Sequence, residues 1–356
     1  MKKPDPHADR LTLKDYGWNA HFERQIADEE RTATRAVRVL AVHRDALDVA
    51  GPAFEGRVQP PRGESEDDVA TVGDWLLVEA EAPRAVRVLE RRSVFRRKAA
   101  GTGRRVQLIA ANVDTLIVVT SANHDFNLAR LERYLAWAAE AETTPLVVIT
   151  KADLVADTAD YVAQARRLMP GLVVEAFDAR GTDTTTKLAP WFAPGQTFAL
   201  VGSSGVGKST IVNSLKGANV QETNAIREYD AHGRHTTTGR SLHRMAGGAW
   251  LLDTPGMREL QIIDVADGLD EVFADVAELA ATCRFTDCKH NSEPGCAIQA
   301  AVTSGALDAE RLKRYQNLQR EQARNAESLA EAHTRSQRFG RMAKKLFADK
   351  LKNRGW

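Results

Sequence analysis

A glycine-rich stretch in the second half of the chain has the residue types of a loop that binds phosphate. Its nine residues are Gly202, Ser203, Ser204, Gly205, Val206, Gly207, Lys208, Ser209 and Thr210. They fit the pattern G-x-x-x-x-G-K-[ST] and follow an apolar run at 198–201 that predicts a buried strand. Glycines allow consecutive backbone N–H groups to converge on phosphate oxygens, and the dipole of the following helix favours the same anion. We expect Lys208 to contact the terminal phosphates of a nucleotide and Ser209 to ligate Mg²⁺.

A second motif, made of Asp253, Thr254, Pro255 and Gly256, follows another apolar strand pattern at 250–252. A carboxylate at such a strand end can reach the metal through water, while the N–H of Gly256 contacts the terminal phosphate. The four residues also spell an ordinary turn, just as the phosphate stretch fits a tight turn between a strand and a helix. Because these motifs occur together with a third one, we favour the nucleotide-binding interpretation.

The third motif, Thr150, Lys151, Ala152 and Asp153, follows a buried-strand pattern at 145–149. Asp153 can accept hydrogen bonds from N1–H and the exocyclic amine of guanine, and the stem of Lys151 can lie against the ring. Adenine does not offer that pair of donors, so the motif predicts GTP rather than ATP. Asn is the usual first residue, so Thr150 leaves open whether a contact that holds the loop is missing or replaced. Without the phosphate loop, a salt-bridged turn would be the simpler interpretation.

The order of these motifs predicts a circularly permuted domain. Ordinary GTPases place the guanine-recognition motif last, whereas here it precedes the phosphate loop. Strand patterns alternate with helical ones, the strands near 113–120, 145–150, 171–177, 197–202 and 249–253, and the helices at 128–142 and 161–168. This alternation predicts an α/β sheet with nucleotide loops at its strand ends.

All three cysteines of the chain lie near one histidine, in the set Cys283, Cys288, His290 and Cys296. Three thiolates and one imidazole complete a tetrahedron around Zn²⁺ with no open position, so we predict one structural zinc ion per chain. Buried free thiols near a surface histidine are the alternative, but the clustering of every cysteine favours zinc. Three cysteines in so long a chain also argue against a secreted disulfide framework.

The length of 356 residues allows two or three domains with sizeable cores. We predict an extension at 1–33, a small β domain at 34–106, the nucleotide domain at 107–264 and a helical zinc-binding domain with a basic tail at 265–356. Short alternating strands favour a barrel in the second part, at 36–42, 68–80 and 85–89. The extension is polar with scattered aromatic residues and is expected to be flexible or helical. A long polar helix is predicted from 308 to about 333.

The net charge of +1 conceals two basic blocks. Residues 84–105 contain nine Lys and Arg against one acid, and the chain from 311 onward contains thirteen against four. Such blocks are the footprint expected for a protein that binds the phosphate backbone of a nucleic acid, although a solvated helix face is the alternative. No targeting segment is present, and the longest apolar runs are too short to cross a bilayer. We therefore expect a cytoplasmic protein that does not bind membranes.

The motif order, together with Gly233 to Thr238 between the phosphate loop and 253–256 and the Cys/His cluster after them, resembles the ribosome small-subunit-dependent GTPase A (RsgA) family. The resemblance extends from Gly73, Asp74 and Trp75 to the cysteines. It implies an α/β, circularly permuted P-loop GTPase domain with an N-terminal RNA-binding OB-fold barrel and a C-terminal helical zinc-binding domain. It also implies a GTPase that binds the small ribosomal subunit and its rRNA late in maturation and hydrolyses GTP to GDP and phosphate under stimulation by that subunit.

The resemblance also suggests roles for individual residues. Thr237 would complete the Mg²⁺ shell, with Thr236 and Thr238 as rivals. Many GTPases orient the attacking water with a Gln after Asp-x-x-Gly, but this chain has Met257, which cannot make that hydrogen bond. We therefore expect slow unaided turnover. His235 is the candidate catalytic residue, and contact of His235 with RNA alone is the alternative.

Near position 178 the family usually has a Ser-Ala pair that touches guanine. Here Asp178 and Ala179 occupy the place, so the contacts of the base at this point are open, although Ala179 could still offer its backbone N–H.

Two other functional classes remain open at this stage. The chain could be a non-catalytic RNA-binding assembly module that uses guanine nucleotide only as a structural ligand. A metabolic P-loop phosphotransferase is disfavoured, because no substrate-pocket signature accompanies the motifs. We expect a monomer.

Overall fold

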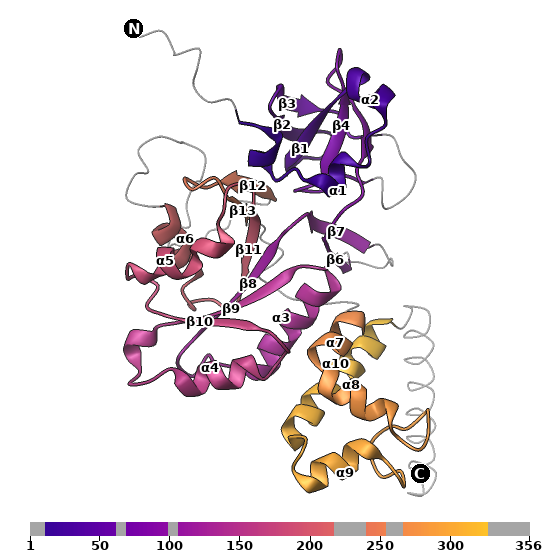
Figure 1. The fold of residues 1–356 in the computed structure, drawn as a ribbon, viewed down its shortest axis with the longest axis vertical. Coiled ribbons are helices and arrows are strands. Elements are labelled where there is room, and N and C mark those ends of the chain that lie inside the picture. The colour runs from indigo at the N-terminus through magenta and orange to yellow at the C-terminus, as the bar shows by residue number, and fades with distance from the viewer. Residues whose placement is uncertain (1–10, 62–68, 99–105, 217–239, 254–265, 327–356) are drawn as a thin grey trace, which may run out of the picture.

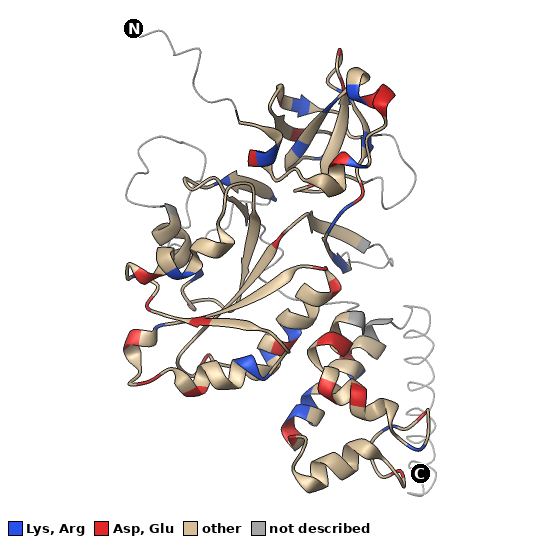
Figure 2. Ribbon diagram, in the orientation of Figure 1, with Lys and Arg blue, Asp and Glu red and all other residues tan. Residues whose placement is uncertain are grey.

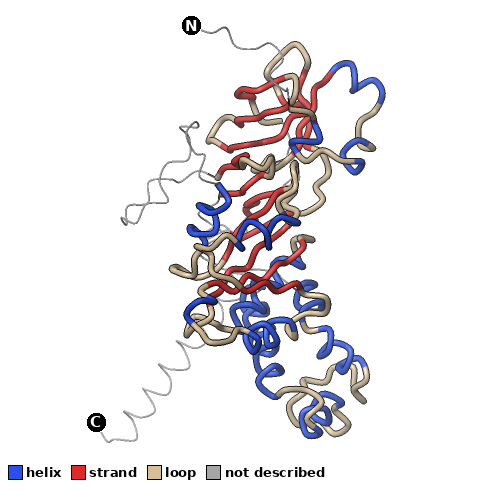
Figure 3. The backbone as a smooth tube through the Cα atoms, turned by 60° about the vertical axis from the view of Figure 1, so that its left-hand side comes forward, coloured by secondary structure: helices blue, strands red, loops and turns tan. Residues whose placement is uncertain are grey.

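The computed structural model describes residues 11–61, 69–98, 106–216, 240–253 and 266–326. Along the longest axis, a small barrel is followed by a sheet flanked by helices and then by a group of helices (Figure 1). Figure 3 shows the strands as a column from the barrel through the sheet, with the helical group at the other end. None of the described helices is long and apolar enough to span a membrane.

The nucleotide-motif region forms a six-stranded part of the main sheet, in the order β10-β9-β8-β11-β13-β12. The strands are β8 (Thr115–Ser121), β9 (Thr144–Thr150), β10 (Val173–Ala176), β11 (Thr197–Val201), β12 (Ser241–Arg244) and β13 (Trp250–Asp253). All neighbours pair in parallel except β12 with β13. All seven residues of β8 are buried, as expected for a central parallel strand covered on both faces.

Helices cover both faces of this sheet (Figure 1). Two of them, α3 (Leu128–Glu140) and α4 (Ala159–Arg166), share a buried cluster with Leu116 and Val118 of β8. The other two, α5 (Asp183–Leu188) and α6 (Lys208–Lys216), share a second cluster with Ile117 and Val119. Because successive side chains of a strand point to opposite faces, the two clusters lie on opposite sides of the sheet.

The barrel contains five strands, which are β1 (Thr34–Val42), β2 (Leu47–Gly51), β3 (Phe54–Val58), β4 (Trp75–Glu79) and β5 (Ala85–Val88). They pair in the order β3-β2-β1-β4-β5, and an isolated parallel bridge joins Gln59, just after β3, to Arg84, just before β5. This bridge brings the two ends of the row together, so the strands form the partly open five-stranded barrel of an OB-fold. Small apolar residues such as Val37, Val39 and Val49 fill its interior.

The described part of the segment before the barrel consists of η1 (Leu13–Tyr16), α1 (Ala20–Glu23) and α2 (Asp28–Ala33). Tyr16 stacks on Trp250 of β13 with ring centroids 5.4 Å apart. The buried Arg38 of β1 donates to the carbonyl of Tyr16 at 2.5 Å and to Oγ1 of Thr197 at 2.7 Å. Burial lowers the pKa of Arg38 to about 10. The predicted extension is thus helical in its described part, and it packs between the barrel and the nucleotide sheet.

A hairpin of β6 (Val94–Lys98) and β7 (Val106–Ala111) forms a separate two-stranded sheet after the barrel. Phe95 of this hairpin contacts Trp137 of α3 edge to face, with centroids 4.7 Å apart. The barrel and the nucleotide sheet are also joined directly, because Ala41 of β1 pairs with Ser241 of β12.

The described C-terminal residues form four helices, of which the first and the last contact α3. They are α7 (Ala266–Val272), α8 (Ala274–Ala281), α9 (Ala297–Ser304) and α10 (Ala309–Ala326). Gly268 of α7 lies so close to α3 that a Cβ there would stand 2.0 Å from the carbonyl oxygen of Ala136. The fully buried carboxylate of Glu132 accepts hydrogen bonds from Arg314 at 2.8 and 3.0 Å and from Arg311 at 3.3 Å. A charged network therefore fastens α10 to the nucleotide domain.

The predicted strands and helices of the nucleotide domain agree with the structure to within two residues at each end, whereas β2, β3, β6, β7, β12 and α5 were not predicted. The strand predicted at 68–80 is wrong in its described first half. There the carboxylate of Asp74 accepts the N–H of Thr71 at 2.7 Å, and Gly73 has φ 90°, so the chain turns before β4 begins. The long polar helix is confirmed as α10 up to Ala326, and its predicted end lies outside the described residues.

Candidate functional site

The three nucleotide motifs that were predicted from the sequence follow three parallel strands of one sheet. Thr150 ends β9, Gly202 follows β11, and Asp253 ends β13. Because these strands are parallel, their carboxyl ends lie at the same edge, where α/β sheets bind ligands. The fold thus brings to one edge residues that lie more than a hundred positions apart in the sequence, such as Thr150 and Asp253.

The glycine-rich loop has the backbone conformation that its residue types predict. Gly202, Gly205 and Gly207 have φ values of 139°, 78° and 97°, which residues other than glycine rarely adopt. At Gly202 a Cβ would also stand 2.1 Å from the carbonyl oxygen of Val119. Lys208 begins α6, and its ammonium group donates to the carbonyls of Gly202 at 2.7 Å and Ser203 at 2.5 Å. The Lys208 side chain therefore lies along the loop, with its charge at the loop's first residues.

Thr150 provides the contact that its departure from Asn had left open. Its hydroxyl lies 2.6 Å from the carbonyl oxygen of Val206 in the phosphate loop and 3.0 Å from that of Thr120. Thr120, Thr150 and Val206 are all buried, so within the described residues these two carbonyls are the acceptors for the hydroxyl proton. A threonine hydroxyl thus joins the loop that was predicted to recognise guanine to the predicted phosphate loop.

Asp153, the predicted guanine-binding carboxylate, lies beside the loop that follows β10. Nη2 of Arg180 donates to its Oδ2 at 2.6 Å, and the same guanidinium donates to Asp178 at 3.1 and 3.2 Å. These side-chain hydrogen bonds from Arg180 hold the pKa of Asp178 below its ordinary value. Ala179 is buried, and its carbonyl accepts hydrogen bonds from Ser214 at 2.8 Å and Thr184 at 3.1 Å. Lys151 has a left-handed backbone, with φ 58°.

Arg130 of α3 is a second cationic side chain at the phosphate loop, in addition to Lys208. Its Nη1 donates to Oγ of Ser203, and its Nη2 donates to the carbonyl of Asp125 at 3.0 Å. Asn127 caps the same helix by accepting the N–H of Arg130 at 3.0 Å. No sequence pattern indicates this contact, because Arg130 lies seventy-three positions before Ser203 and belongs to no motif.

Some of the remaining residues that were predicted to bind nucleotide lie within the described structure, and others do not. Ser209 and Thr210 lie in the first turn of α6 and are partly buried, whereas Ser204 is exposed and Val206 is buried. Ala152 begins the 3-10 turn η3 (Ala152–Leu154) that carries Asp153. The predicted catalytic His235, the predicted magnesium ligand Thr237 and its rivals, Gly256 and Met257 lie outside the described residues.

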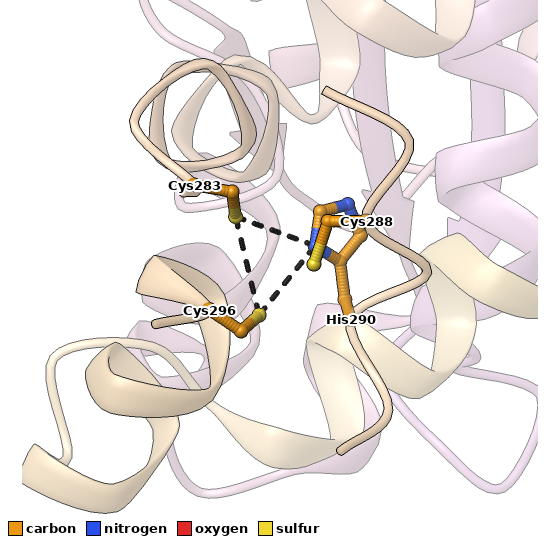
Figure 4. A group of neighbouring side chains, drawn as sticks. All are labelled: Cys283, Cys288, His290 and Cys296. Carbon is orange, nitrogen blue, oxygen red and sulfur yellow. Dashed lines mark hydrogen bonds between the residues drawn. The ribbon is translucent and has the colours of Figure 1, made fainter. Parts of the chain in front are cut away.

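The four predicted zinc ligands come together in the C-terminal helices (Figure 4). Their ligand atoms all lie within 4.8 Å of one another. Nδ1 of His290 is 3.6 Å from Sγ of Cys283 and 3.6 Å from Sγ of Cys296, and these two sulfurs are 4.0 Å apart. Metal–sulfur bonds of about 2.3 Å in a tetrahedron would place neighbouring ligand atoms roughly 3.7 Å apart. The cluster thus has the composition and spacing of a metal site.

Short elements hold these ligands in place. Cys283 follows α8, and Cys296 is the N-cap of α9, where its sulfur accepts the N–H of Gln299 at 3.4 Å. In the loop between them, the carboxylate of Glu293 accepts the N–H groups of Lys289, Asn291 and Ser292 at 2.8 to 3.0 Å. These backbone hydrogen bonds lower the pKa of Glu293 to about 2. The loop that presents His290 is therefore fixed by an ionised side chain.

Part of each basic block is used inside the protein. Five arginines form ion pairs with acids of other elements, namely Arg87 with Glu30, Arg91 with Asp74, Arg92 with Asp114, and Arg311 and Arg314 with Glu132. In the view of Figure 2, Lys and Arg are interspersed with Asp and Glu over the barrel, the sheet and the C-terminal helices. These five residues are paired within the protein and do not form the solvated helix face that was the alternative, so the charge counts overstate the basic surface.

Comparison with solved structures defines the class of protein. The crystal structure of YloQ, described as a circularly permuted GTPase, superposes with a TM-score of 0.57 at 23% identity and covers 83% of this chain and 97% of that one. YjeQ from Thermotoga maritima gives the same TM-score and identity over 80% and 97% of the two chains. The fold is therefore that of the circularly permuted GTPases, as the motif order predicted.

Sequence comparison identifies the family within that class. Residues 88–263 match the model of the RsgA GTPase family. The chain is 48% identical over 340 residues to small ribosomal subunit biogenesis GTPase RsgA 2 of Vibrio parahaemolyticus, covering 96% of this chain and 94% of the relative. It is 49% identical over 317 residues to RsgA of Mesorhizobium japonicum, covering 88% and 91%. The chain belongs to the RsgA GTPase family and is a GTP hydrolase, so both predictions are confirmed.

Proposed function

We propose that this GTPase binds the small ribosomal subunit and its rRNA, acts late in the maturation of that subunit, and hydrolyses GTP to GDP and phosphate under stimulation by it. The observation that carries this proposal is the name shared by relatives 48% and 49% identical to the chain, which are small ribosomal subunit biogenesis GTPases. The alignments cover more than nine-tenths of each relative. We further propose that the chain acts as a cytoplasmic monomer, with the domain boundaries at 33, 106 and 264.

The site at the sheet edge is proposed to bind GTP and GDP. Positions 202–210 would surround the phosphates, and Asp253 and Gly256 would lie near the terminal one. The motif at 150–153 would bind the guanine base, with Asp153 as the residue that distinguishes it from adenine. The geometry of the described loop supports this, because Lys208 and Arg130 place two cations at its first residues.

Magnesium is proposed to bind with GTP through Ser209 and Thr237. Ser209 fits this role because it lies in the first turn of α6, directly after Lys208. The ion would neutralise charge on the phosphate oxygens. His235 is proposed to supply the polar contact to the attacking water that Met257 cannot make.

The metal of the Cys/His cluster is proposed to be a structural zinc ion. Three thiols and one imidazole form a closed donor set of the kind that zinc prefers, and the ligand-atom distances fit a tetrahedron. Elemental analysis of the purified chain should find one zinc per chain, and a Cys283→Ser variant should bind it far less tightly. A full complement of zinc in that variant after dialysis against a chelator would contradict the assignment.

The functional proposal is tested by measuring GTP turnover with and without purified small ribosomal subunits, with ATP as the control nucleotide. We expect slow turnover of GTP alone, strong stimulation by the subunits and none with ATP. His235→Ala should keep its affinity for GDP and lose the stimulation. Binding of the subunits without any stimulation would instead favour the RNA-binding assembly module.

A further inference from the structure

A three-residue charged cluster borders the proposed guanine site. Nη2 of Arg180 lies 2.6 Å from Oδ2 of Asp153 and 3.2 Å from Oδ2 of Asp178, and Nε lies 3.1 Å from Oδ1 of Asp178. The backbone N–H of Arg180 also donates to Asp178, at 3.0 Å. Because the Arg180 side chain is 69% exposed, the two carboxylates hold it in place rather than surrounding packing.

This arrangement orients Asp153 without using the positions that guanine needs. A carboxylate has about four acceptor positions on its two oxygens, and Arg180 uses one on Oδ2. Within the described part of the chain, no hydrogen bond reaches Oδ1 of Asp153. A pair of adjacent acceptor positions therefore stays open for N1–H and the exocyclic amine of the base, while Arg180 restricts rotation of the carboxylate.

The same guanidinium offsets the negative charge of Asp178, an unusual residue at this position. Two carboxylates near each other repel, and each then favours a position farther from the other. Arg180 lies between Asp153 and Asp178 and donates to both. Its fork-shaped guanidinium can do so in one conformation, which the point charge of a lysine cannot. Asp178 thus fixes Arg180, and Arg180 in turn fixes Asp153.

We propose that Arg180 is a positioning residue that sets the affinity and selectivity for guanine nucleotides through Asp153. The proposal rests on the guanine site proposed above and adds a residue and a role to it. Selectivity depends on the orientation of the carboxylate, because hypoxanthine has N1–H but lacks the exocyclic amine. If the Asp153 carboxylate could rotate freely, the exocyclic amine of guanine would add less to the binding affinity.

Titration calorimetry of the full chain with GDP, IDP and ADP tests the proposal. We expect Arg180→Ala to weaken GDP binding about tenfold, within the range of a single charge-assisted hydrogen bond. The affinity for IDP should fall less and the affinity for ADP should not change, so the preference for GDP over IDP should become smaller. The affinity of Arg180→Lys for GDP should lie between that of Arg180→Ala and that of the unmodified chain. The melting temperature should not change, because exposed ion pairs contribute little to stability.

Control variants separate the role of Arg180 from the guanine site itself. Arg57→Ala removes a similarly exposed arginine that is bound to Asp48 in the barrel at 2.9 Å, and it should leave GDP binding unchanged. Asp153→Ala should abolish the preference for guanine, and adding Arg180→Ala to it should cause no further loss.

Different outcomes would contradict the proposed guanine site and the proposed role of Arg180. Unchanged GDP binding by Asp153→Ala would show that the guanine site is wrong. Loss of binding in Asp153→Ala, together with equal or tighter GDP binding by Arg180→Ala, would overturn only the role of Arg180. Additive losses in the double variant would also overturn it, because Arg180 would then act independently of Asp153.

Discussion

Thr150 shows how one side chain can replace the usual residue of a motif. An asparagine would reach the phosphate loop with its amide, whereas Thr150 reaches the carbonyl of Val206 with a shorter hydroxyl group at 2.6 Å. A Cβ at Gly207 would lie 3.4 Å from the Thr150 hydroxyl oxygen, an ordinary contact, so glycine is favoured there by its φ of 97° and not by lack of space. The residue type in the motif therefore depends on how closely the two loops approach.

Thr150→Val tests this contact at nearly constant volume. The carbonyl of Val206 would lose its donor in a buried place, so we expect a loss of about 1–3 kcal/mol in the free energy of unfolding and weaker GDP binding. Thr150→Ser keeps the hydroxyl and loses a methyl group, so it should keep its affinity for GDP while losing some stability. Equal GDP affinities for the Val and Ser variants would show that the hydroxyl is not needed.

At the scale of elements, α3 connects the nucleotide site to the rest of the molecule. Its first turn carries Arg130 at the phosphate loop, and its middle carries Glu132 in the ion-pair network with α10. Further along, Ala136 lies against Gly268 of α7, and Trp137 lies against the β6–β7 hairpin. One helix of thirteen residues thus contacts four separate parts of the fold.

Gly268→Ala should separate α7 from α3. The new Cβ would stand 2.0 Å from a backbone oxygen that cannot move aside as a flexible side chain could. We expect a loss of about 1–3 kcal/mol in the free energy of unfolding, measured by denaturant titration. Gly247→Ala is the matched control, because the nearest atom is 4.0 Å away and no positive φ is involved, so its stability should be unchanged or slightly higher. Similar values for the two variants would contradict the close packing.

How far the sequence predicts each element depends on its burial. Strands covered on both faces, such as β8 and β9, are continuous apolar runs between recognisable motifs, so their bounds were predicted closely. β12 has four residues, of which only Leu242 is buried, and its formation depends on pairing with β13 and β1. Neither hydrophobic period nor motif marks such a strand.

The candidate site shows the same division. The glycines, Lys208 and the cysteines were predicted because local spacing reveals them. The contacts of Arg130 and Arg180 were not, because they join segments that meet only in the folded chain. The hydroxyl contact of Thr150 depends on the distance between two loops, which no sequence pattern specifies.

At the scale of the whole molecule, the N-terminal segment joins the barrel to the nucleotide sheet. Tyr16 stacks on Trp250, whose indole N–H donates to the carbonyl of Asp15 at 2.8 Å. On the barrel side, Trp18 contacts Trp75 edge to face, with centroids 4.7 Å apart. The segment therefore contributes aromatic contacts to both neighbours and fixes their relative position.

Tyr16→Ala should weaken this junction. Loss of a buried aromatic side chain should lower the free energy of unfolding by about 3 kcal/mol. If the segment couples the two parts, calorimetry should also show the single unfolding transition broadening or splitting. Phe285→Ala, at an aromatic residue that is 42% exposed, is the control and should change stability by less than about 0.5 kcal/mol. A Tyr16→Ala protein as stable as that control would contradict the junction.

The pairing of β1 with β12 has a consequence for fragments of the chain. Within the described residues, β12 has β13 on one side and β1 on the other, so the barrel covers a strand that would otherwise end the nucleotide sheet. A fragment that starts at residue 107 would leave β12 with unpaired N–H and C=O groups. It would also expose the face of Trp250 on which Tyr16 stacks. Such open edges can pair with strands from other molecules, so the separated domain should self-associate more readily than the whole chain.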